Sequence, residues 1–261
     1  YSHDPETLTP TGLYLEPAIQ NKAFTTETFT DSNYITTNAT TGDAIVVLAT
    51  DNNITNPDGS TGTVYMTVEA GERTKVYPKG IRKTGTAYLT QTLSCFVKKK
   101  THRYVSLSHG GQTHYRGINF DFDTETITSD STGNQFTSGN GGFVKYPNGW
   151  YRLFLHTTGN TGSDGFSVHI PKHPSTAKPI ASSDKLTYDG TESVYIWGLN
   201  CCNVDFLSTY IPNSGGTELN QNADNFTSTA TEVLDRANGT KPAFYTPNGI
   251  SLFASGELNN V

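Results

Sequence analysis

The protein has 261 residues, enough for one large β-sandwich or barrel with or without a small appendage. Only 16% of its residues are charged, against roughly 25% in ordinary soluble domains, so its polarity comes mainly from hydroxyl and amide side chains. A net charge of −6 argues against a nucleic-acid partner, because phosphate binding needs a basic face. A membrane-spanning helix is not expected either, since no apolar stretch approaches the roughly 20 residues that it needs.

Short runs rich in β-branched and aromatic residues, separated by turn signals, predict an all-β domain of antiparallel strands. In chain order these runs are Ala44–Leu48, Thr63–Val68, Ala87–Val97, Arg103–Ser108, Ile118–Phe122, Glu125–Thr128, Trp150–His156, Phe166–Ile170 and Val194–Leu199. Gly, Pro and Asn mark the turns between them, as at Pro147-Asn148-Gly149. The basic run Lys98-Lys99-Lys100 is interpreted as a solvated turn that joins its two flanking strands as a hairpin.

The composition of the chain changes after Gly215-Gly216. Residues 1–215 carry the strand signals and are predicted to form the sandwich. Residues 216–261 hold fewer apolar side chains, and we expect a mostly irregular C-terminal extension, a linker or the start of another module. One short helix is expected there, around Ala230–Ala237.

The three cysteines do not make a disulfide framework. Two of them, Cys201 and Cys202, are adjacent, and a disulfide between neighbouring residues is strained and rare. Buried free thiols are therefore expected.

Several phrases follow one another in a characteristic order along residues 1–215. They are Ser2-His3-Asp4-Pro5, Gly12-Leu13-Tyr14-Leu15-Glu16-Pro17, Leu93-Ser94-Cys95-Phe96-Val97-Lys98, His102-Arg103-Tyr104-Val105, Phe120-Asp121-Phe122-Asp123-Thr124, Asn148-Gly149-Trp150-Tyr151-Arg152, Val194-Tyr195-Ile196-Trp197-Gly198-Leu199 and Ser208-Thr209-Tyr210-Ile211-Pro212. This ordered set resembles a module of bacteriophage tail fibres, tail spikes and other virion-surface proteins. That module is a jelly-roll-like sandwich, similar to concanavalin-type and carbohydrate-binding modules. Asn200 and Cys202 replace its usual Gln and Glu, so any role of that pair is lost.

The resemblance implies a phage structural protein at the virion surface, hence extracellular, that is not an enzyme. It implies other virion proteins as partners, with host surface polysaccharide as a ligand of an adhesive module. A homo-oligomer is the default for such a part, and a trimer is the usual form of phage fibres. Two alternatives stay open: a purely architectural decoration or adaptor protein, and a sandwich-fold glycoside hydrolase or lyase.

Most of the residues that carry the resemblance are interpreted as structural. Trp150 and Trp197 alternate with aliphatic residues along strands, so we expect both in the core rather than on a sugar-binding surface. Tyr210-Ile211-Pro212 is interpreted as the exit of the last strand, held by a packed tyrosine, because proline ends strand pairing.

The hydrolase alternative depends on Asp121, Asp123 and Glu125. Alternation along one extended strand would put these three carboxylates on one face, and hydrolysis of a glycosidic bond uses a pair of carboxyl groups. The favoured interpretation is that Asp123-Thr124-Glu125 forms a hairpin turn between two short strands, without catalysis.

No cofactor is expected, apart from a structural Ca²⁺ such as jelly-roll sugar-binding modules often carry. Carboxylates suit this ion, and Glu16, Asp43, Asp164 and Asp205 are the candidates, although no spacing singles them out. His109 and His114 flank Gly110-Gly111 as a metal clip would, but an ordinary loop is the favoured interpretation of that pair.

A glycan site would combine exposed aromatic rings with side chains that bond to hydroxyl groups. Tyrosines near turns or on outward strand positions are the candidates for stacking, and nearby arginine and glutamine side chains are the candidates for hydrogen bonding. The predicted set is Tyr77, Arg103, Tyr104, Gln112, Tyr115, Arg116, Tyr146 and Tyr151.

Overall fold

The chain divides into two units, of which the larger spans Gln20–Leu219. The computed structural model describes residues 2–3, 10–12, 18–23, 26–29, 34–35, 46–73, 80–83, 90–110, 115–132, 138–159, 166–173, 186–213 and 219–221. In the smaller unit, Tyr1–Ile19 with Asn220–Val261, β1 (Ser2–His3) pairs antiparallel with β2 (Pro10–Gly12). The expected boundary at residue 215 and the helix around Ala230–Ala237 lie outside the described residues, so both stay predictions.

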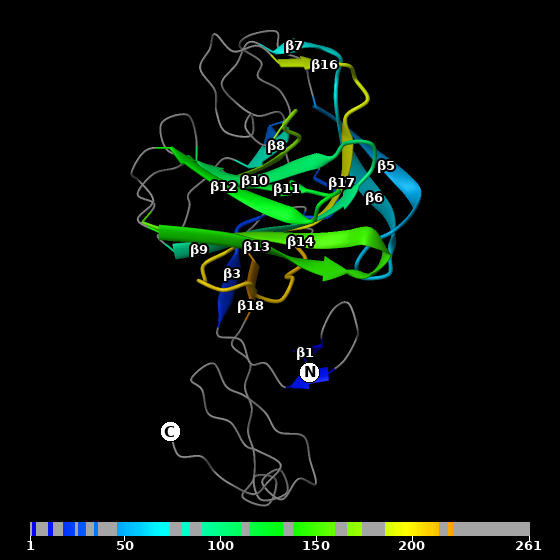
Figure 1. The fold of residues 1–261 in the computed structure, drawn as a ribbon. Helices are drawn as coiled ribbons and strands as arrows, with labels where there is room; N and C mark the ends of the chain where they lie inside the picture. The colour runs from blue at the N-terminus through cyan, green and yellow to red at the C-terminus, as the bar shows by residue number, and fades with distance from the viewer. Residues whose placement is uncertain are drawn as a thin grey trace, which may run out of the picture. The chain divides into compact units, whose positions relative to one another are not determined.

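Two antiparallel sheets make up the sandwich, and Figure 1 shows them one above the other. The six-stranded sheet has the order β12-β11-β10-β15-β8-β4, with bounds β12 (Thr126–Thr132), β11 (Tyr115–Asp121), β10 (Tyr104–Gly110), β15 (Phe166–His169), β8 (Gly80–Lys83) and β4 (Tyr34–Ile35). The eight-stranded sheet has the order β13-β14-β9-β17-β3-β18, and β6 joins β5 to β17. Its bounds are β13 (Ser138–Tyr146), β14 (Trp150–Thr158), β9 (Thr90–Lys99), β17 (Ser193–Cys202), β3 (Ile19–Asn21), β18 (Leu219–Gln221), β5 (Val46–Thr55) and β6 (Thr61–Val68). A separate pair consists of β7 (Gly71–Arg73) and β16 (Leu186–Tyr188).

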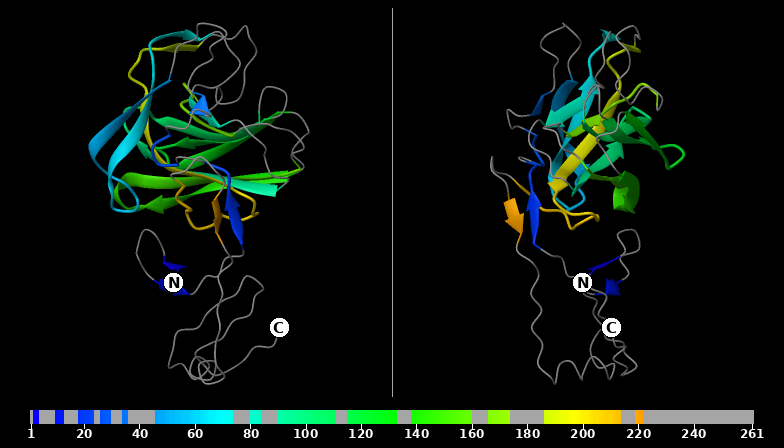
Figure 2. Two further views of the ribbon diagram at one scale, coloured as in Figure 1. Left: turned by 180° about the vertical axis from the view of Figure 1, so that it is seen from behind. Right: turned by 90° about the vertical axis from the view of Figure 1, so that its left-hand side faces the viewer.

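The main hydrophobic core lies between the two sheets. Figure 2 shows the sheets from two further sides. Alternate residues of each strand point into the core, as strand geometry requires. Leu107 of β10 comes from one sheet, while Leu93 of β9 and Leu153 of β14 come from the other, and all three are fully buried. Each such leucine contributes about 1.5–3 kcal/mol through removal from water, so burial of this layer stabilises the sandwich.

A second cluster, the outer aromatic cluster, lies on the opposite face of the eight-stranded sheet. Its buried members are Phe96, Trp150, Tyr195 and Trp197, and the partly buried Ile54, Tyr65, Tyr146 and Tyr210 pack against them. On β17, Val194 and Ile196 point into the inter-sheet core, while Tyr195 and Trp197 point into this cluster. β17 is therefore buried on both faces, which explains its nearly continuous apolar sequence.

The predicted sandwich of antiparallel strands is confirmed, and so are the buried positions of Trp150 and Trp197. The expectation of buried free thiols is confirmed as well, for Cys95, Cys201 and Cys202. Burial raises the pKa of the Cys95 thiol to about 12. Among the described residues, no helix has the length and hydropathy to cross a membrane.

Tyr210 is packed as expected but does not end a strand. β17 ends at Cys202, and Tyr210 follows in an irregular segment. The centroid of its ring lies 4.6 Å from that of Trp197, and its hydroxyl group donates to Glu27 Oε1 at 2.9 Å. The tyrosine thus fixes the segment that covers part of the outer aromatic cluster.

The segment Lys99–Arg103 does not close a hairpin, so this expectation is wrong. β9 pairs with β14 and β17, whereas β10 pairs with β11 and β15 in the other sheet. The segment is an arch between the sheets. The reason is a tertiary contact: the N–H groups of Thr101 and His102 both donate to the Ser193 carbonyl, at 3.1 and 3.0 Å, which ties the arch to β17.

Gly198 is a position that strongly favours glycine. Its φ is 60°, and an added Cβ would lie 3.0 Å from Phe96 Cδ2 and 3.1 Å from Tyr210 Cε2. We expect Gly198→Ala to lower the free energy of unfolding by about 2 kcal/mol, through left-handed strain and overpacking. Chemical denaturation measures this loss.

Gly59 provides the matched control, since its φ is also positive, at 88°, but no atom lies within 4 Å of an added Cβ. Gly59→Ala therefore carries the backbone strain alone. Equal losses in the two variants would contradict the role of the aromatic contacts.

Candidate ligand-binding patch

A row of polar side chains lies on the face of the six-stranded sheet that points away from the core. Ser106 and Ser108 of β10 alternate with aliphatic residues that belong to the core. Ser106 is in register with Asn119 of β11 and with His169 of β15. The Ser106 hydroxyl group donates to Asn119 Oδ1 at 2.7 Å, and Ser108 Oγ lies 3.5 Å from His169 Nε2. We call these four residues the serine strip.

The serine strip is closed to solvent. Asn119 is 4% exposed, and its three neighbours are 2% exposed or less. Burial of a hydroxyl or amide group costs free energy unless the group is hydrogen-bonded, and these side chains bond to one another across three strands. The strip therefore holds β11, β10 and β15 in register rather than offering an open surface.

The same face of the sheet becomes partly exposed at Tyr104, the first residue of β10. Tyr104 points to the same face as Ser106 because strand side chains alternate. Its ring makes edge contacts with His102 and His173, with centroids 5.8 and 5.7 Å away. The Arg103 guanidinium carbon lies 5.2 Å from the centroid of the same ring. Such a cation–aromatic contact orients the guanidinium group.

Two carboxylates complete this surface. Asp121 is in register with Tyr104 and accepts two bonds from Arg103, from Nε at 2.8 Å and from Nη2 at 2.6 Å. Asp123 Oδ2 lies 3.4 Å from Arg103 Nε, and its other carboxylate oxygen pairs with Lys99. We call Arg103, Tyr104, Asp121, Asp123 and His173 the Tyr104 patch.

The charges of the patch are balanced and persistent. Arg103 holds the pKa of the Asp121 carboxyl well below its ordinary value of 3.8, and the same hydrogen bonds raise the pKa of Arg103. Both groups therefore stay charged across the ordinary pH range. The Arg103 and Asp123 side chains are each 43% exposed, whereas that of Asp121 is 13% exposed. A ligand would thus meet one aromatic ring among accessible but mutually paired charges.

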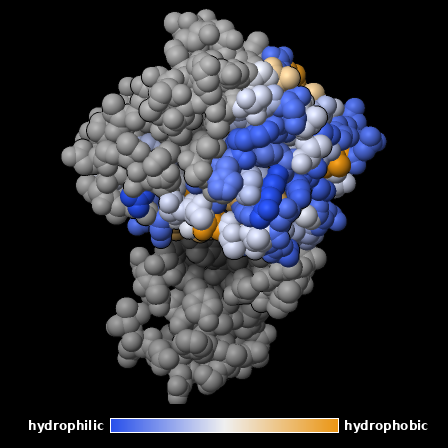
Figure 3. Space-filling view, turned by 45° about the horizontal axis from the view of Figure 1, so that its top comes forward, coloured by the Kyte–Doolittle hydropathy of each residue, from blue (hydrophilic) through white to orange (hydrophobic). Residues whose placement is uncertain are grey.

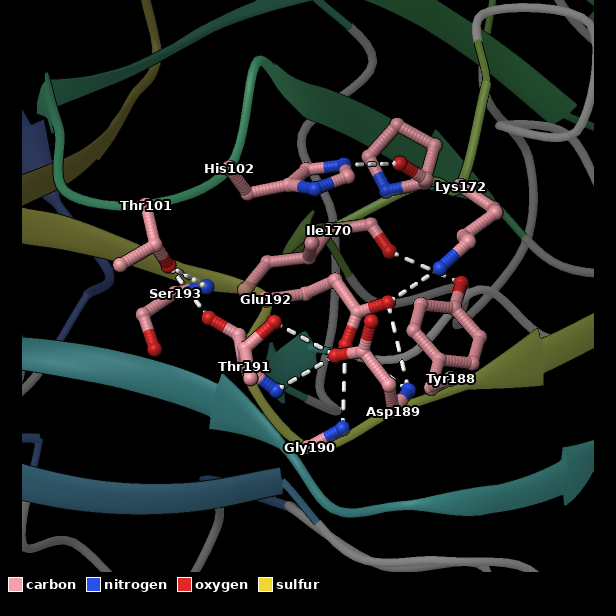
Figure 4. A network of polar contacts seen from close by, with 11 residues as sticks. Thr101, His102, Ile170, Lys172, Tyr188, Asp189, Gly190, Thr191, Glu192 and Ser193 are labelled. Atoms are coloured by element: carbon pink, nitrogen blue, oxygen red, sulfur yellow. Dashed lines mark hydrogen bonds and ion pairs between the residues drawn. The ribbon is translucent and has the colours of Figure 1, made fainter.

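A buried carboxylate, that of Glu192, holds a segment that leads to the patch, and Figure 4 shows its polar contacts. Glu192, whose side chain is 5% exposed, forms an ion pair with Lys172. Its carboxylate also accepts bonds from the backbone N–H groups of Asp189 and Gly190, each at 3.2 Å. Lys172 precedes His173, so this pair fixes the segment that places the histidine against Tyr104.

The arch is attached to the same support. The Ser193 N–H donates to Thr101 Oγ1 at 2.9 Å, and the Thr101 hydroxyl group donates to the Thr191 carbonyl. His102 Nε2 donates to the Pro171 carbonyl at 2.7 Å. These bonds, most of them drawn in Figure 4, join the arch, the exit of β15 and the start of β17. Arg103 and Tyr104 are therefore held by contacts between residues 69 to 92 positions apart.

His102 is expected to make the protein less stable in mild acid. Burial lowers the pKa of its imidazole below the ordinary value of 6.5. The unfolded chain therefore binds the proton more tightly than the folded protein does. The contribution of His102 to stability is complete above about pH 6.5 and is lost as the pH falls towards the lowered folded pKa.

Unfolding curves at about pH 7.5 and pH 5 measure this effect. The loss of stability between the two should be smaller in His102→Gln than in the wild type. His173→Gln is the matched control, because this neighbouring histidine is exposed. An unchanged pH dependence in His102→Gln would contradict the assignment.

The three carboxylates of the hydrolase alternative do not share a strand face, so that placement is wrong. Asp121 ends β11, and a turn over residues 122–125 leads into β12, which confirms the favoured hairpin. Glu125 has a φ of 51° and lies 3.0 Å from Lys145 Nζ. Lys145 lowers the pKa of the Glu125 carboxyl, so this group, like Asp121, is held ionised rather than as a proton donor.

Two of the predicted glycan-binding tyrosines are buried, which corrects their expected outward positions. Tyr151 is 8% exposed because its ring packs against Phe120 and Phe143 between the sheets, with its hydroxyl group donating to Glu125. Tyr115 is 1% exposed, and its ring covers Gly117, whose added Cβ would lie 2.2 Å from the Tyr115 hydroxyl oxygen.

The remaining predicted residues are divided among different places. Arg103 and Tyr104 belong to the Tyr104 patch. Arg116 lies on β11 at the far end from Asp121, and Tyr146 packs on the outer aromatic cluster of the other sheet. Tyr77 and Gln112 lie outside the described residues.

The metal candidates are not brought together in the part of the chain that the structure describes. No group of three or more His, Cys, Asp or Glu side chains there is arranged to hold an ion. Asp205 is among the described residues, but Glu16, Asp43, Asp164 and His114 are not. The loop interpretation of His109 is wrong, because His109 lies within β10. It is 1% exposed, with Nδ1 2.8 Å from Gln91 Nε2.

Sequence reasoning missed the serine strip and the Glu192 support. A signal for the strip was present, because serines alternate with Val105 and Leu107 on β10. No comparable signal pointed to Glu192, whose partners come from turns. Neither a family model nor a curated protein matches this sequence, so the function is argued from the patch itself.

Proposed function

We propose that this chain is a structural module on the surface of a bacteriophage particle and that it binds a neutral host-cell glycan through the Tyr104 patch. The phage assignment is supported by the ordered motifs of residues 1–215 together with the antiparallel sandwich. The glycan assignment is carried by one observation, the partly exposed side chain of Tyr104 set among paired polar groups. Other virion proteins are the partners of such a module.

The chemistry of the patch suits hydroxyl-rich ligands. An aromatic ring offers an apolar face to the C–H groups of a sugar, with polar groups beside it. Arg103 has five N–H donors, of which Asp121 takes two, and the two aspartates supply acceptors. Sugar hydroxyl groups donate and accept, so they match both kinds of partner. Because Arg103 and the neighbouring Lys99 balance Asp121 and Asp123, the patch together with Lys99 has no net attraction for a charged polymer.

The proposed module acts without catalysis. Hydrolysis of a glycosidic bond needs one protonated carboxylic acid beside the bond that breaks. Arg103 and Lys145 keep Asp121 and Glu125 ionised, which favours binding over bond cleavage.

A panel of purified host-surface polysaccharides, neutral and acidic, tests the proposal by calorimetry or on an array. We expect binding to a neutral polysaccharide and a loss of affinity of about tenfold or more in Tyr104→Ala. Tyr65→Ala, which removes another partly buried tyrosine from the opposite sheet, is the matched control and should bind as the wild type does. Absence of binding to every polysaccharide, or unchanged binding by Tyr104→Ala, would overturn the glycan assignment.

A purely architectural role is the second candidate. It is favoured by the internal pairing of Arg103 with Asp121, which satisfies these groups without a ligand. The same panel separates the two functions, because an architectural module binds no polysaccharide and loses incorporation into particles when the patch is altered.

A further inference from the structure

β5 (Val46–Thr55) is the terminal strand on one side of the eight-stranded sheet. Among the described residues only β6 pairs with it, and Figures 1 and 2 show β5 at the margin of the sandwich. In an antiparallel strand every second residue directs its N–H and C=O groups away from the neighbouring strand. The outward edge of β5 therefore presents a row of backbone donors and acceptors.

The two halves of β5 differ in how well this edge is protected. After Thr50 the strand carries Asp51, and its register shifts between Asp51 and Thr55. The Asp51 carboxylate bonds to the N–H of Asn53 at 3.0 Å. A charge and a bulge are the usual devices that prevent edge-to-edge pairing. Val46–Thr50 has neither, since it pairs with β6 in unbroken register and holds no charged residue and no proline.

An exposed hydrophobic side chain marks the same half-strand. Val47 is 43% exposed, and among the described residues no other large hydrophobic side chain is as exposed. The described surface visible in Figure 3 is mainly hydrophilic, with a few small hydrophobic spots. Val46 and Leu48 point into the inter-sheet core, so Val47 and Ala49 lie on the other face of the strand. An exposed apolar edge of this kind is a site for strand addition.

The other described edge strands are better protected. β12 carries Asp130 and is otherwise made of Thr, Ser and one isoleucine, and β13 holds three glycines and Lys145. β4 has two residues only. β18 (Leu219–Gln221) and the edge strand β16 of the small sheet have three residues each. Among the described edge strands, Val46–Thr50 is therefore the longest run that is in regular register, uncharged and mainly apolar.

We infer that Val46–Thr50 is a self-association edge, at which β5 of a second copy of this chain pairs antiparallel across a two-fold axis. An antiparallel pair of identical strands is symmetric, so each copy uses the same surface. With Leu48 opposite its symmetry mate, Val47 of each copy lies opposite Ala49 of the other. Both valines are then covered by the partner, and the eight-stranded sheets join into one.

A second copy fits this edge better than a charged partner does, because the segment carries no charge. Each copy has a net charge of −6, so long-range repulsion opposes approach. Added salt screens that repulsion and leaves the backbone hydrogen bonds intact. The dimer should therefore become tighter as the salt concentration rises.

Sedimentation or light scattering of the full chain, over concentrations up to about 1 mM, tests self-association, including weak association. We expect a monomer–dimer equilibrium that shifts towards dimer with salt. Val47→Lys should weaken it at least tenfold, because a lysine on an edge strand blocks pairing. Thr61→Lys adds the same charge at an exposed position of β6 and is expected to leave the equilibrium unchanged.

Cysteine pairs test the register. In the double variant Val47→Cys with Ala49→Cys, the two positions face each other across the two-fold axis at a distance that a disulfide can span. Mild oxidation should therefore give a covalent dimer on a non-reducing gel. The native Cys95, Cys201 and Cys202 are buried and do not compete.

Three outcomes would overturn the inference: a monomer at every concentration, a trimer in place of a dimer, or a dimer that survives Val47→Lys. A trimer counts against it because an isologous edge pair closes with two copies. These outcomes are independent of the glycan assay, so failure of one proposal does not decide the other.

Discussion

Replacing Glu192 by alanine is expected to lower the free energy of unfolding by about 2–4 kcal/mol. The change leaves the N–H groups of Asp189 and Gly190 without their acceptor and leaves Lys172 without its counter-ion. Lys172 is 39% exposed, so water stabilises its charge in part, and the expected loss lies below that of a fully buried pair. Urea titration with linear extrapolation measures the change.

Binding should fall together with stability, under conditions in which Glu192→Ala is still folded. The contacts of Glu192 hold the segment that carries His173, and its neighbours Thr191 and Ser193 bond to the arch that leads to Tyr104. A displaced Tyr104 patch loses affinity even though every patch residue is unchanged. Glu192→Gln keeps an acceptor oxygen and the side-chain volume, so an intermediate loss of stability and affinity is expected.

Glu125→Ala is the matched control for the removal of an ion-paired carboxylate. The Glu125 and Lys145 side chains are about equally exposed, at 40% and 38%. Exposed ion pairs contribute little to stability, so a small change is expected. If Glu125→Ala destabilised the protein as much as Glu192→Ala, the special role of the buried carboxylate would be wrong.

The strands were predictable because their signal is local. Alternation of apolar and polar residues reports that one face of a strand is buried, and Trp150–His156 lies within β14 for this reason. Val194–Leu199 lies within β17, as predicted. This strand is buried on both faces and extends to Cys202, so its apolar residues run on without alternation.

The partners of the strands were not predictable in the same way. A short basic segment between two strands predicts a hairpin by local rules, yet Lys99–Arg103 crosses between the sheets. The deciding contact is made with Ser193, about ninety positions away in the chain. A single sequence carries no direct signal for a contact at that separation.

The candidate site was predictable in part, for a related reason. Arg103 and Tyr104 lie at the start of β10 and are partly exposed, and the local sequence indicated a position at a strand end for both. Tyr151 has a similar local context but is buried against Phe120 and Phe143 of other strands, and Tyr115 is buried as well. Side-chain exposure in a sandwich depends on the opposing sheet, which neither alternation nor turn position specifies.

The largest single loss is expected in the outer aromatic cluster. Trp197→Ala should lower the free energy of unfolding by about 3–5 kcal/mol, the usual cost of truncating a buried aromatic side chain. Trp197 is 3% exposed. Its ring centroid lies 5.3 Å from that of Phe96 and 4.6 Å from that of Tyr210. Its removal opens a cavity between the sheet and the segment that Tyr210 fixes.

Trp197→Phe keeps an aromatic ring and provides a folded variant if the alanine variant does not fold. Its expected loss is about half that of Trp197→Ala. Tyr65→Ala is the control at the margin of the same cluster, where the side chain is partly exposed, so a smaller loss is expected. If Trp197→Ala cost no more than Tyr65→Ala, the outer face would be a covering layer, and stability would come from the inter-sheet core alone.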